Sequence, residues 1–334
     1  MEQPRVYNTE DELIKWLKSY LEKQKEEVVK KDKLILDIGN NDNPIIIDFK
    51  FKLINIIKEL DKTKYKTNNT IIDCKINFCK ITFNQEVDFS NLTFYNVELN
   101  FSSSEFKDKV YFIGTKFIPE NPEKPKNNII FEYTTFSKEV NFYKASFCDI
   151  SFFLTKFNES VDFSNNSFKN ITNFYTVIFN NGANFYKTSF LYRAKFSGVS
   201  FNNGVCFSEV LFNRAKFLDN NFHYDKNKCK DNINDNNKID FSHITISDYL
   251  ELDNTYIQDD TEIIFDNMIF KDNKSYLSIM NIKKEINKLS LKDITIDGRI
   301  NIQNVEVETV DFKGSVINGG LVNPVNFEVD EFEK

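Results

Sequence analysis

Residues 161–190 read VDFSNNSFKNITNFYTVIFNNGANFYKTSF, and this stretch decides the fold. Its phenylalanines stand five or six residues apart, and the two step lengths alternate. An α-helix repeats about every 3.6 residues and a flat strand about every two, so neither element explains the spacing. The spacing predicts a short strand followed by a turn, repeated at each phenylalanine: 163, 168, 174, 179, 185 and 190.

The same register extends far beyond this stretch. Phenylalanines continue it from Phe78 to Phe222, and mainly aliphatic residues carry it on from Phe241 to Phe327. Self-similarity at a short, fixed period is the sequence signature of a solenoid. We expect about forty strand-and-turn units, or roughly ten coils, between residue 71 and the C-terminus.

A small or β-branched residue lies two residues before most of these phenylalanines, as at Val161 and Ala183. Residues i−2 and i of a strand point to the same side. Each unit should therefore send one small and one large side chain inward, while flanking residues such as Asp162 and Ser164 point outward. We also expect each phenylalanine to lie over the one from the preceding coil, where stacked rings attract each other.

At this point the chain resembles the pentapeptide-repeat family, whose units read small residue, Asp or Asn, Leu or Phe, Ser or Thr, then any residue. The matching units include Val161-Asp162-Phe163-Ser164-Asn165 and Ala183-Asn184-Phe185-Tyr186-Lys187, and the match runs from about residue 72 to the C-terminus. The resemblance implies an all-β solenoid, a right-handed quadrilateral β-helix with four units per coil. The frequent sixth residue resembles the phenylalanine-rich branch of the family.

Insertions follow a rule when the steps are numbered from Phe78. Every odd step up to Phe222 is five residues long, and every longer step is even. With four sides per coil, even steps fall on two opposite corners. We therefore expect loops 118–128 and 223–238 to leave the shaft at opposite corners. Loops on a rigid scaffold are frequent binding sites.

Residues 1–70 lack the register, so we divide the chain into an N-terminal α/β cap or accessory domain, 1–70, and the β-helix, 71–334. Thr9-Glu10-Asp11-Glu12 reads as a helix-capping box. We expect a helix over 9–31, a strand in Ile45–Phe51, and a second helix or turn in Lys52–Leu60. A cap would cover the unpaired edge of the first coil; the alternative is a separate partner-binding domain.

The register is interrupted once more at residues 275–290. Four apolar residues there step by three, four and three: Ile279, Ile282, Ile286 and Leu289. This stripe is typical of a helix. It predicts a short helical insertion packed on the shaft, with a helix offered to a partner as the alternative.

Composition and charge narrow the function. The net charge of −7 gathers late in the chain, because residues 223–334 sum to about −9 while 1–70 and 71–222 sum to about +1 each. The chain thus lacks a strongly basic face, and we expect no direct binding of nucleic acid. No apolar run approaches the ~20 residues that cross a bilayer, and no signal peptide is evident, so we expect a cytoplasmic protein without a membrane span.

Groups for catalysis or metal binding are sparse. His223, His243 and Cys229 could be read as a metal site, but their spacing matches no zinc pattern. Five cysteines without a CxxC pair indicate reduced thiols. Two histidines do not allow a Ser/His/Asp or Cys/His set. We therefore predict no enzymatic activity, no cofactor and no metal, and single out no catalytic or binding residue.

Two functions from different classes remain. The first is a non-catalytic scaffold for protein–protein interaction that presents loops and outer faces. The second is implied by the resemblance: a DNA-mimicking modulator of a type II topoisomerase (gyrase), acting through the acidic C-terminal coils. Mimicry needs dense negative charge along a rod. The resemblance also implies a homodimer through the C-terminal end, at Pro324–Phe332.

Overall fold

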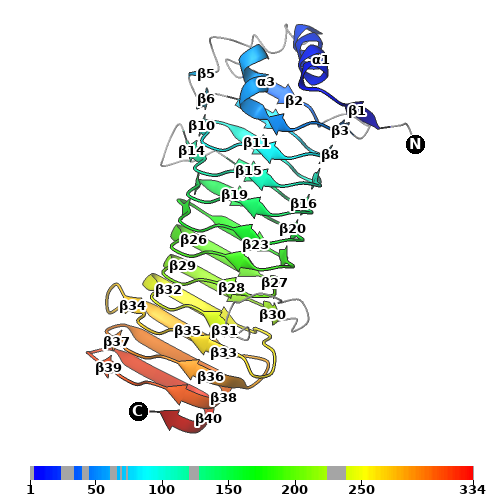
Figure 1. Ribbon diagram of the computed structural model, residues 1–334. Coiled ribbons are helices and arrows are strands. Elements are labelled where there is room, and N and C mark those ends of the chain that lie inside the picture. Colours follow the sequence, from blue (N-terminus) through cyan, green and yellow to red (C-terminus); the bar gives the residue numbers. More distant parts are fainter. Residues whose placement is uncertain are drawn as a thin grey trace. The chain divides into compact units, whose positions relative to one another are not determined.

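The chain forms two compact units, unit 1 (Met1–Glu159) and unit 2 (Ser160–Lys334). Each unit is a parallel β-solenoid, and the two hold about ten turns in total (Figure 1). The expected solenoid is therefore confirmed. The computed structural model describes residues 4–23, 34–39, 45–60, 66–67, 70–72, 74–119, 128–223 and 238–333.

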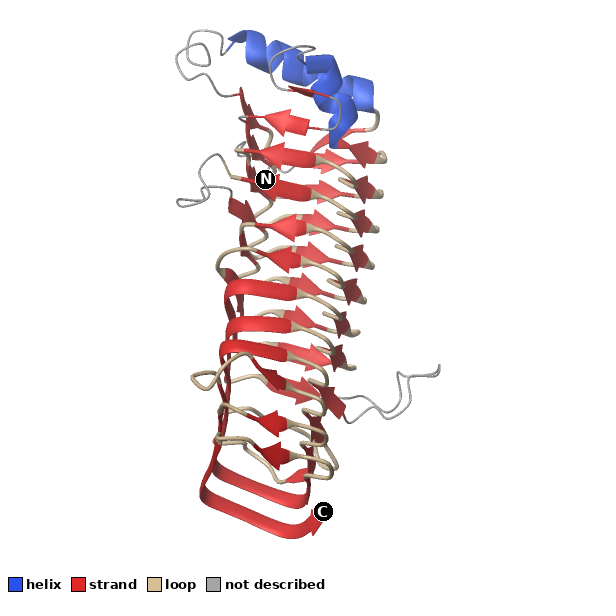
Figure 2. Cartoon of the chain, turned by 90° about the vertical axis from the view of Figure 1, so that its left-hand side faces the viewer, coloured by secondary structure: helices blue, strands red, loops and turns tan. Residues whose placement is uncertain are grey.

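Four stacks of parallel strands form the sides of unit 1 (Figure 2). The first holds β1 (Arg5–Tyr7), β3 (Ile45–Ile47), β8 (Ile81–Phe83), β12 (Glu105–Phe106), β16 (Thr135–Phe136) and β20 (Lys156–Phe157). The second holds β2 (Leu34–Asp37), β7 (Cys74–Asn77), β11 (Glu98–Asn100), β15 (Asn128–Ile130) and β19 (Asp149–Ser151). The third holds β4 (Phe51–Lys52), β9 (Val87–Asp88), β13 (Val110–Tyr111) and β17 (Val140–Asn141). The fourth holds β6 (Thr70–Ile72), β10 (Thr93–Tyr95), β14 (Lys116–Ile118) and β18 (Ser146–Phe147).

Unit 2 repeats this plan with longer strands. The stack that matters below, the β23 stack, holds β23 (Thr172–Tyr175), the later part of β26 (Ser189–Ser197), β29 (Leu211–Leu218), β32 (Thr245–Asp253), β35 (Tyr276–Met280), β38 (Arg299–Asp311) and β40 (Leu321–Glu333). A second stack holds β21 (Val161–Asp162), β25 (Ala183–Asn184), β28 (Val205–Cys206), β31 (Lys238–Asp240), β33 (Glu262–Ile264) and β36 (Ile286–Ser290). The remaining strands are β22 (Ser167–Phe168), β24 (Ile178–Phe179), β27 (Ser200–Asn202), β30 (Asn221–His223), β34 (Ile269–Phe270), β37 (Thr295–Ile296) and β39 (Val316–Ile317).

The N-terminal segment supplies a solenoid coil and the two helices of the described residues, α1 and α3. Strands β2, β3, β4 and β6 pair in parallel with β7, β8, β9 and β10, and β5 (Lys66–Thr67) pairs antiparallel with β6. The five-residue spacing is absent from this coil, because helix α3 (Leu53–Leu60) interrupts the succession of strands. Solenoid strands thus lie on both sides of residue 70, and the domain boundary there stays a prediction.

Helix α1 (Glu10–Lys23) begins at the expected capping box. Thr9 Oγ1 accepts from the Glu12 N–H at 3.3 Å, and Glu12 Oε2 accepts from the Asn8 N–H at 2.8 Å. The helix was expected to reach residue 31, but residues 24–31 lie outside the described part. The strand expected at 45–51 is two short strands, β3 and β4, and the second helix is confirmed as α3.

The helical insertion predicted at 275–290 is wrong, because the segment forms β35 and β36. Leu277 and Ile279 alternate as an inward pair and align with Leu250 and Leu252 of the preceding coil. The three-four-three spacing arises where strand residues and a corner residue, Ile282, happen to fall at helical intervals. The repeat therefore continues through this segment.

The core is a ladder of stacked rings, as expected. Neighbouring rings along the ladder have planes within 11° and centroids 4.9–5.4 Å apart. In unit 1 one such ladder is Phe78, Phe101, Phe131 and Phe152, and in unit 2 another is Phe163, Phe185, Phe207, Phe241 and Phe265. The smaller residues two positions earlier, such as Val161 and Ala183, are also buried.

The odd, five-residue steps correspond to tight corners. In unit 1 the residue two positions after the first phenylalanine of each such step has a φ between 54° and 65°. These residues are Lys80, Asn91, Ser103, Gly114, Tyr133, Lys144 and Leu154. An Asp or Asn before the phenylalanine often accepts from the N–H just after it, as Asp88 does from Ser90 at 2.8 Å. This closed turn leaves no room for a sixth residue.

Loops 118–128 and 223–238 lie almost wholly outside the described residues. Their expected exit from opposite corners therefore stays a prediction. The first connects β14 to β15 in unit 1, and the second connects β30 to β31 in unit 2.

Candidate functional site

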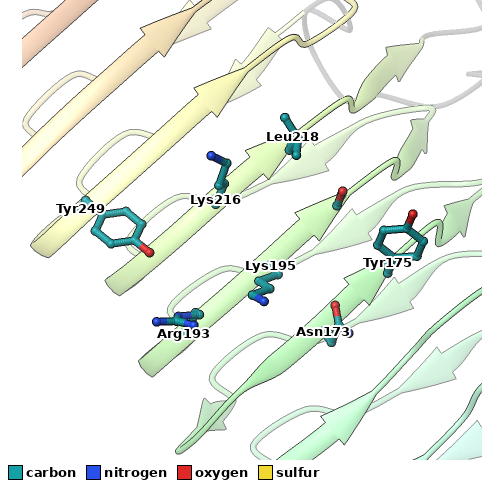
Figure 3. Close-up of a pocket in the computed structure, with 8 residues that line it drawn as sticks. Asn173, Tyr175, Arg193, Lys195, Lys216, Leu218 and Tyr249 are labelled. Carbon is teal, nitrogen blue, oxygen red and sulfur yellow. The ribbon is translucent and has the colours of Figure 1, made fainter.

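The outward face of the β23 stack in unit 2 carries a hollow of about 510 Å³ (Figure 3). We call it the basic groove. Its lining comes from four successive strands: Asn173, Tyr175, Arg193, Lys195, Ser197, Lys216, Leu218 and Tyr249.

The strand register explains the hollow. Tyr175, Ser197 and Leu218 are aligned on three neighbouring strands. The small serine side chain therefore lies between two large ones, which leaves an open space above it. Adjacent strands are about 4.8 Å apart, so the gap from Tyr175 to Leu218 spans two strand spacings and is wide enough for part of a ligand side chain.

An irregularity at the corner within β26 places Arg193 in the lining of the basic groove. The chain takes three residues from Phe190 to Arg193 but only two from Phe212 to Arg214, and the two arginines then align. The extra residue of β26 places Leu191 and Tyr192, 43% and 39% exposed, at the corner beside the groove. The sequence signal for this irregularity is a six-residue step from Phe190 against a five-residue step from Phe212.

Like charges are stacked in the groove wall. Arg193 aligns with Arg214, and Lys195 aligns with Lys216. Neighbouring like charges on adjacent strands are destabilising unless other groups compensate them. The arrangement therefore differs from the pairing of opposite charges on neighbouring strands of unit 2, such as Lys238 with Glu262.

Carboxylates neutralise the cations of only one of these two coils, the coil that holds Arg214 and Lys216. Arg214 Nε donates to Asp248 Oδ2 at 2.5 Å, which raises the pKa of the guanidinium. Lys216 Nζ lies 3.3 Å from Glu251 Oε2. Among the residues that the structure describes, no carboxylate forms an ion pair with Arg193 or Lys195. Arg193 Nε is buried and makes no hydrogen bond within that part of the chain.

Tyrosines mark both ends of the groove. Tyr175 is 47% exposed. Tyr249 stacks on Tyr276 with ring centroids 5.6 Å apart. The Tyr276 hydroxyl donates to Glu251 Oε1 at 2.7 Å, and burial together with this carboxylate raises the pKa of Tyr276. Glu251 is thus held by a phenol and a lysine.

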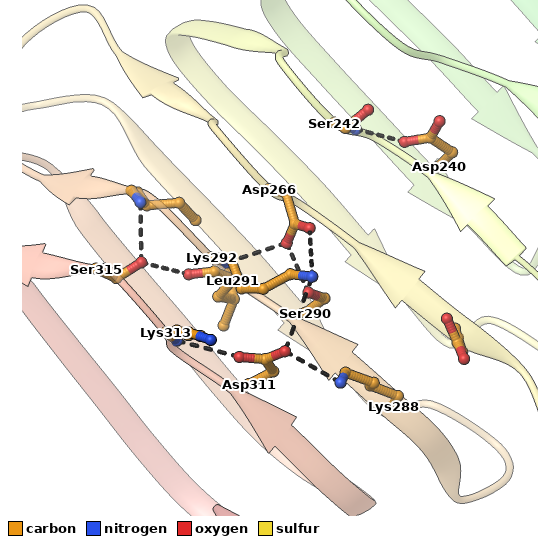
Figure 4. A network of polar contacts seen from close by, with 12 residues as sticks. Asp240, Ser242, Asp266, Lys288, Ser290, Leu291, Lys292, Asp311, Lys313 and Ser315 are labelled. Carbon is orange, nitrogen blue, oxygen red and sulfur yellow. Dashed lines mark hydrogen bonds and ion pairs between the residues drawn. The ribbon is translucent and has the colours of Figure 1, made fainter. Parts of the chain in front are cut away.

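The acidity of the C-terminal third is partly neutralised. The Asp311 side chain is 5% exposed and lies 3.0 Å from Lys288 Nζ and 3.9 Å from Lys292 Nζ (Figure 4). Asp266 lies 3.3 Å from Lys292 Nζ and accepts from Ser290 Oγ at 2.6 Å. These carboxylates bridge coils and do not contribute a free negative surface.

Unneutralised acid is found farther along, on β38 and β40. Glu306 aligns with Glu328 on the neighbouring strand, and both side chains are exposed. Glu308 and Asp330 are also exposed on these strands. The acidic stripe thus extends over two coils.

The earlier metal hypothesis receives no test, because Cys229 and the side chain of His223 lie outside the described residues. His243 is exposed at a corner with a φ of 57°. Cys74, Cys79, Cys148 and Cys206 form no disulfide. Within the described ranges, no group of three or more His, Cys, Asp or Glu could hold a metal ion, and neither helix there is long and apolar enough to span a membrane.

Reasoning from the sequence missed the basic groove, although a signal was present. The tetrapeptide Arg-Ala-Lys-Phe occurs at 193–196 and again at 214–217, one coil apart. Chemically, the groove can hold oxyanions with its cations and apolar or aromatic groups with its tyrosines. Compared with known proteins, the chain matches no protein-family model, no curated protein and no solved structure.

Proposed function

We propose that this protein is a non-catalytic scaffold that binds a protein partner through the outer face of the β23 stack. A β-solenoid of repeats fits a non-catalytic interaction role. The observation that carries the finer proposal is the basic groove, which combines arginine and exposed tyrosine on a rigid stack of strands. Arginine and tyrosine are enriched in protein interfaces and among the residues that contribute most binding energy.

The absence of catalysis is part of the proposal. The groove offers cations, tyrosines and an amide. The carboxylate paired with the lining residue Lys216, Glu251, is also engaged by Tyr276. A general base must reach a substrate proton, and a carboxylate held in this way is better suited to fixing the groove wall.

We also propose membership of the pentapeptide-repeat family. Support comes from the four strand stacks, the inward phenylalanine and the Asp or Asn that closes several of the tight corners. The partner is expected in the same compartment as the protein, which we propose to be the cytoplasm.

The test is affinity capture of the full chain from its source cells, with quantitative mass spectrometry. The wild type is compared with Arg193→Glu/Lys195→Glu and with the control Lys138→Glu/Lys169→Glu, which makes the same charge change at exposed sites outside the β23 stack. We expect one partner to be lost with the groove variant and retained with the control. Equal recovery by all three proteins would contradict the proposal.

A second candidate is DNA mimicry towards a type II topoisomerase, favoured by the exposed Glu306, Glu308, Glu328 and Asp330. Duplex DNA carries one charge per about 1.7 Å of axis, so a stripe over two coils offers a short mimic. Inhibition of gyrase supercoiling by the wild type, relieved in Glu306→Gln/Glu328→Gln, would favour this candidate.

A further inference from the structure

We propose that the basic groove binds a short acidic peptide segment, whose carboxylates lie against Arg193 and Lys195 while an apolar side chain enters the hollow above Ser197. This inference rests on the proposed scaffold function and names the chemistry of its partner.

The charge ladder supplies the first argument. Three successive coils place Arg193 and Lys195, then Arg214 and Lys216, then the acids Asp248 and Glu251 on neighbouring strands. The acids neutralise the middle coil by direct ion pairs. The coil that contains β26 keeps the two cations Arg193 and Lys195. On the other side of β26, strand β23 offers Asn173, a neutral amide aligned with Lys195. These two cations are therefore available to carboxylates of another molecule.

The arginine supplies an independent argument. Arg193 Nε is buried without a hydrogen-bond partner in the described part of the chain. A buried donor without a partner is costly. A ligand carboxylate beside the guanidinium would form short, charge-assisted hydrogen bonds with its terminal amino groups and offset part of this cost.

The hollow determines which other side chain the acidic peptide must carry. Tyr175, Ser197 and Leu218 surround an open space with apolar surface on two sides. An aliphatic side chain fits there, next to the two cations. The expected ligand therefore alternates acidic residues with at least one leucine-like residue.

The surroundings favour a peptide over a nucleic acid. Asp219, Asp248 and Asp253 lie on or next to the strands that carry the groove. A long polyanion would meet these carboxylates at either flank, whereas a peptide can match two cations with two acids. Nucleic-acid affinity grows with the number of phosphates neutralised, and two uncompensated cations provide little of it.

The test is fluorescence anisotropy on the full chain at low salt. The probe is a labelled eight-residue peptide of glutamate with a central leucine. We expect saturable binding that weakens at least about tenfold in Arg193→Gln/Lys195→Gln, since charge-assisted hydrogen bonds contribute about that much. The control Lys169→Gln/Arg299→Gln should change affinity less than about twofold, since exposed charges outside the contact contribute little. Ser197→Phe, which fills the hollow, should weaken binding with both cations in place; thermal melts confirm that each variant folds.

The alternatives are resolved by further arms of the experiment. Equal binding of the peptide by wild type and groove variant would overturn the site. Tighter binding of a single-stranded DNA 12-mer than of the peptide, lost in the same variant, would overturn the peptide in favour of nucleic acid. No peptide binding, while the groove variant still loses its partner in affinity capture, would overturn this inference and leave the scaffold function standing.

Discussion

At the scale of single residues, buried hydroxyls connect successive coils. Thr155 Oγ1 donates to the Phe131 carbonyl at 2.6 Å, and Thr188 Oγ1 donates to the Phe163 carbonyl at 2.7 Å. Both threonines occupy the inward position two residues before a phenylalanine. The sequence pattern predicts a small, inward residue there, but it does not reveal the hydrogen bond, because the acceptor lies one coil away.

Thr155→Val should destabilise unit 1 by about 1 kcal/mol, since it removes one buried hydrogen bond while keeping the side-chain shape. The measurement is the urea midpoint of unfolding at constant m-value. Thr135→Val is the matched control, because Thr135 points outward and should change stability by less than about 0.5 kcal/mol. An equal effect at both positions would contradict the role of the Thr155 hydroxyl.

Corner residues make a second prediction at this scale. Lys144 has a φ of 57°, while exposed Lys138 is not among the residues with positive φ. Lys144→Gly should stabilise the protein by about 0.5–1 kcal/mol, because an L-residue is strained in the left-handed region. Lys138→Gly should destabilise it by a similar amount, because glycine adds chain entropy to the unfolded state. Thermal melts of the two variants should therefore shift in opposite directions.

At the scale of elements, each side of a coil is a short strand held by the ring ladder and by its neighbours. Phe152 is fully buried and stacks on Phe131 with centroids 5.4 Å apart, whereas the adjacent Phe153 points outward and meets the Tyr133 ring. Inward and outward phenylalanines thus follow each other directly in the chain.

This pair provides a test of the ladder. Phe152→Ala should cost roughly 3–5 kcal/mol because it leaves a cavity in a closely packed core. Phe153→Ala should cost less than about 1 kcal/mol, since its ring is partly in solvent. Denaturant titrations of both variants measure the difference in the free energy of unfolding. Similar losses of stability at the two positions would contradict the inward position of Phe152 and the outward position of Phe153.

The sequence predicted these elements well where the register is regular. The ladder from Phe78 onward follows from spacing alone, because each coil repeats the same environment. Prediction failed at 275–290, where corner and strand residues imitate a helical stripe. It also missed the coil in residues 34–72, since α3 breaks the period there. The basic groove could not be located because its depth depends on which outward side chains align across strands.

At the scale of the whole molecule, both units follow one rule: apolar rings inside, and ion pairs or hydrogen bonds between coils outside. Lys75 with Glu98 in unit 1 and Lys238 with Glu262 in unit 2 are examples, with N–O distances of 3.2 and 3.4 Å. Arg193 and Lys195 depart from that rule, as do the aligned acids Glu306 and Glu328. A departure from an otherwise consistent pattern is where a functional site is expected.

The most direct test places a photo-crosslinking amino acid, p-benzoylphenylalanine, at Tyr175 in the groove or at Tyr133 in unit 1. The two tyrosines are 47% and 56% exposed, so both probes reach solvent. After irradiation in the source cells, we expect a discrete cross-linked protein adduct from position 175 and none from position 133. An adduct from position 133 alone, or no adduct from position 175, would contradict the claim that this protein contacts its partner through the basic groove.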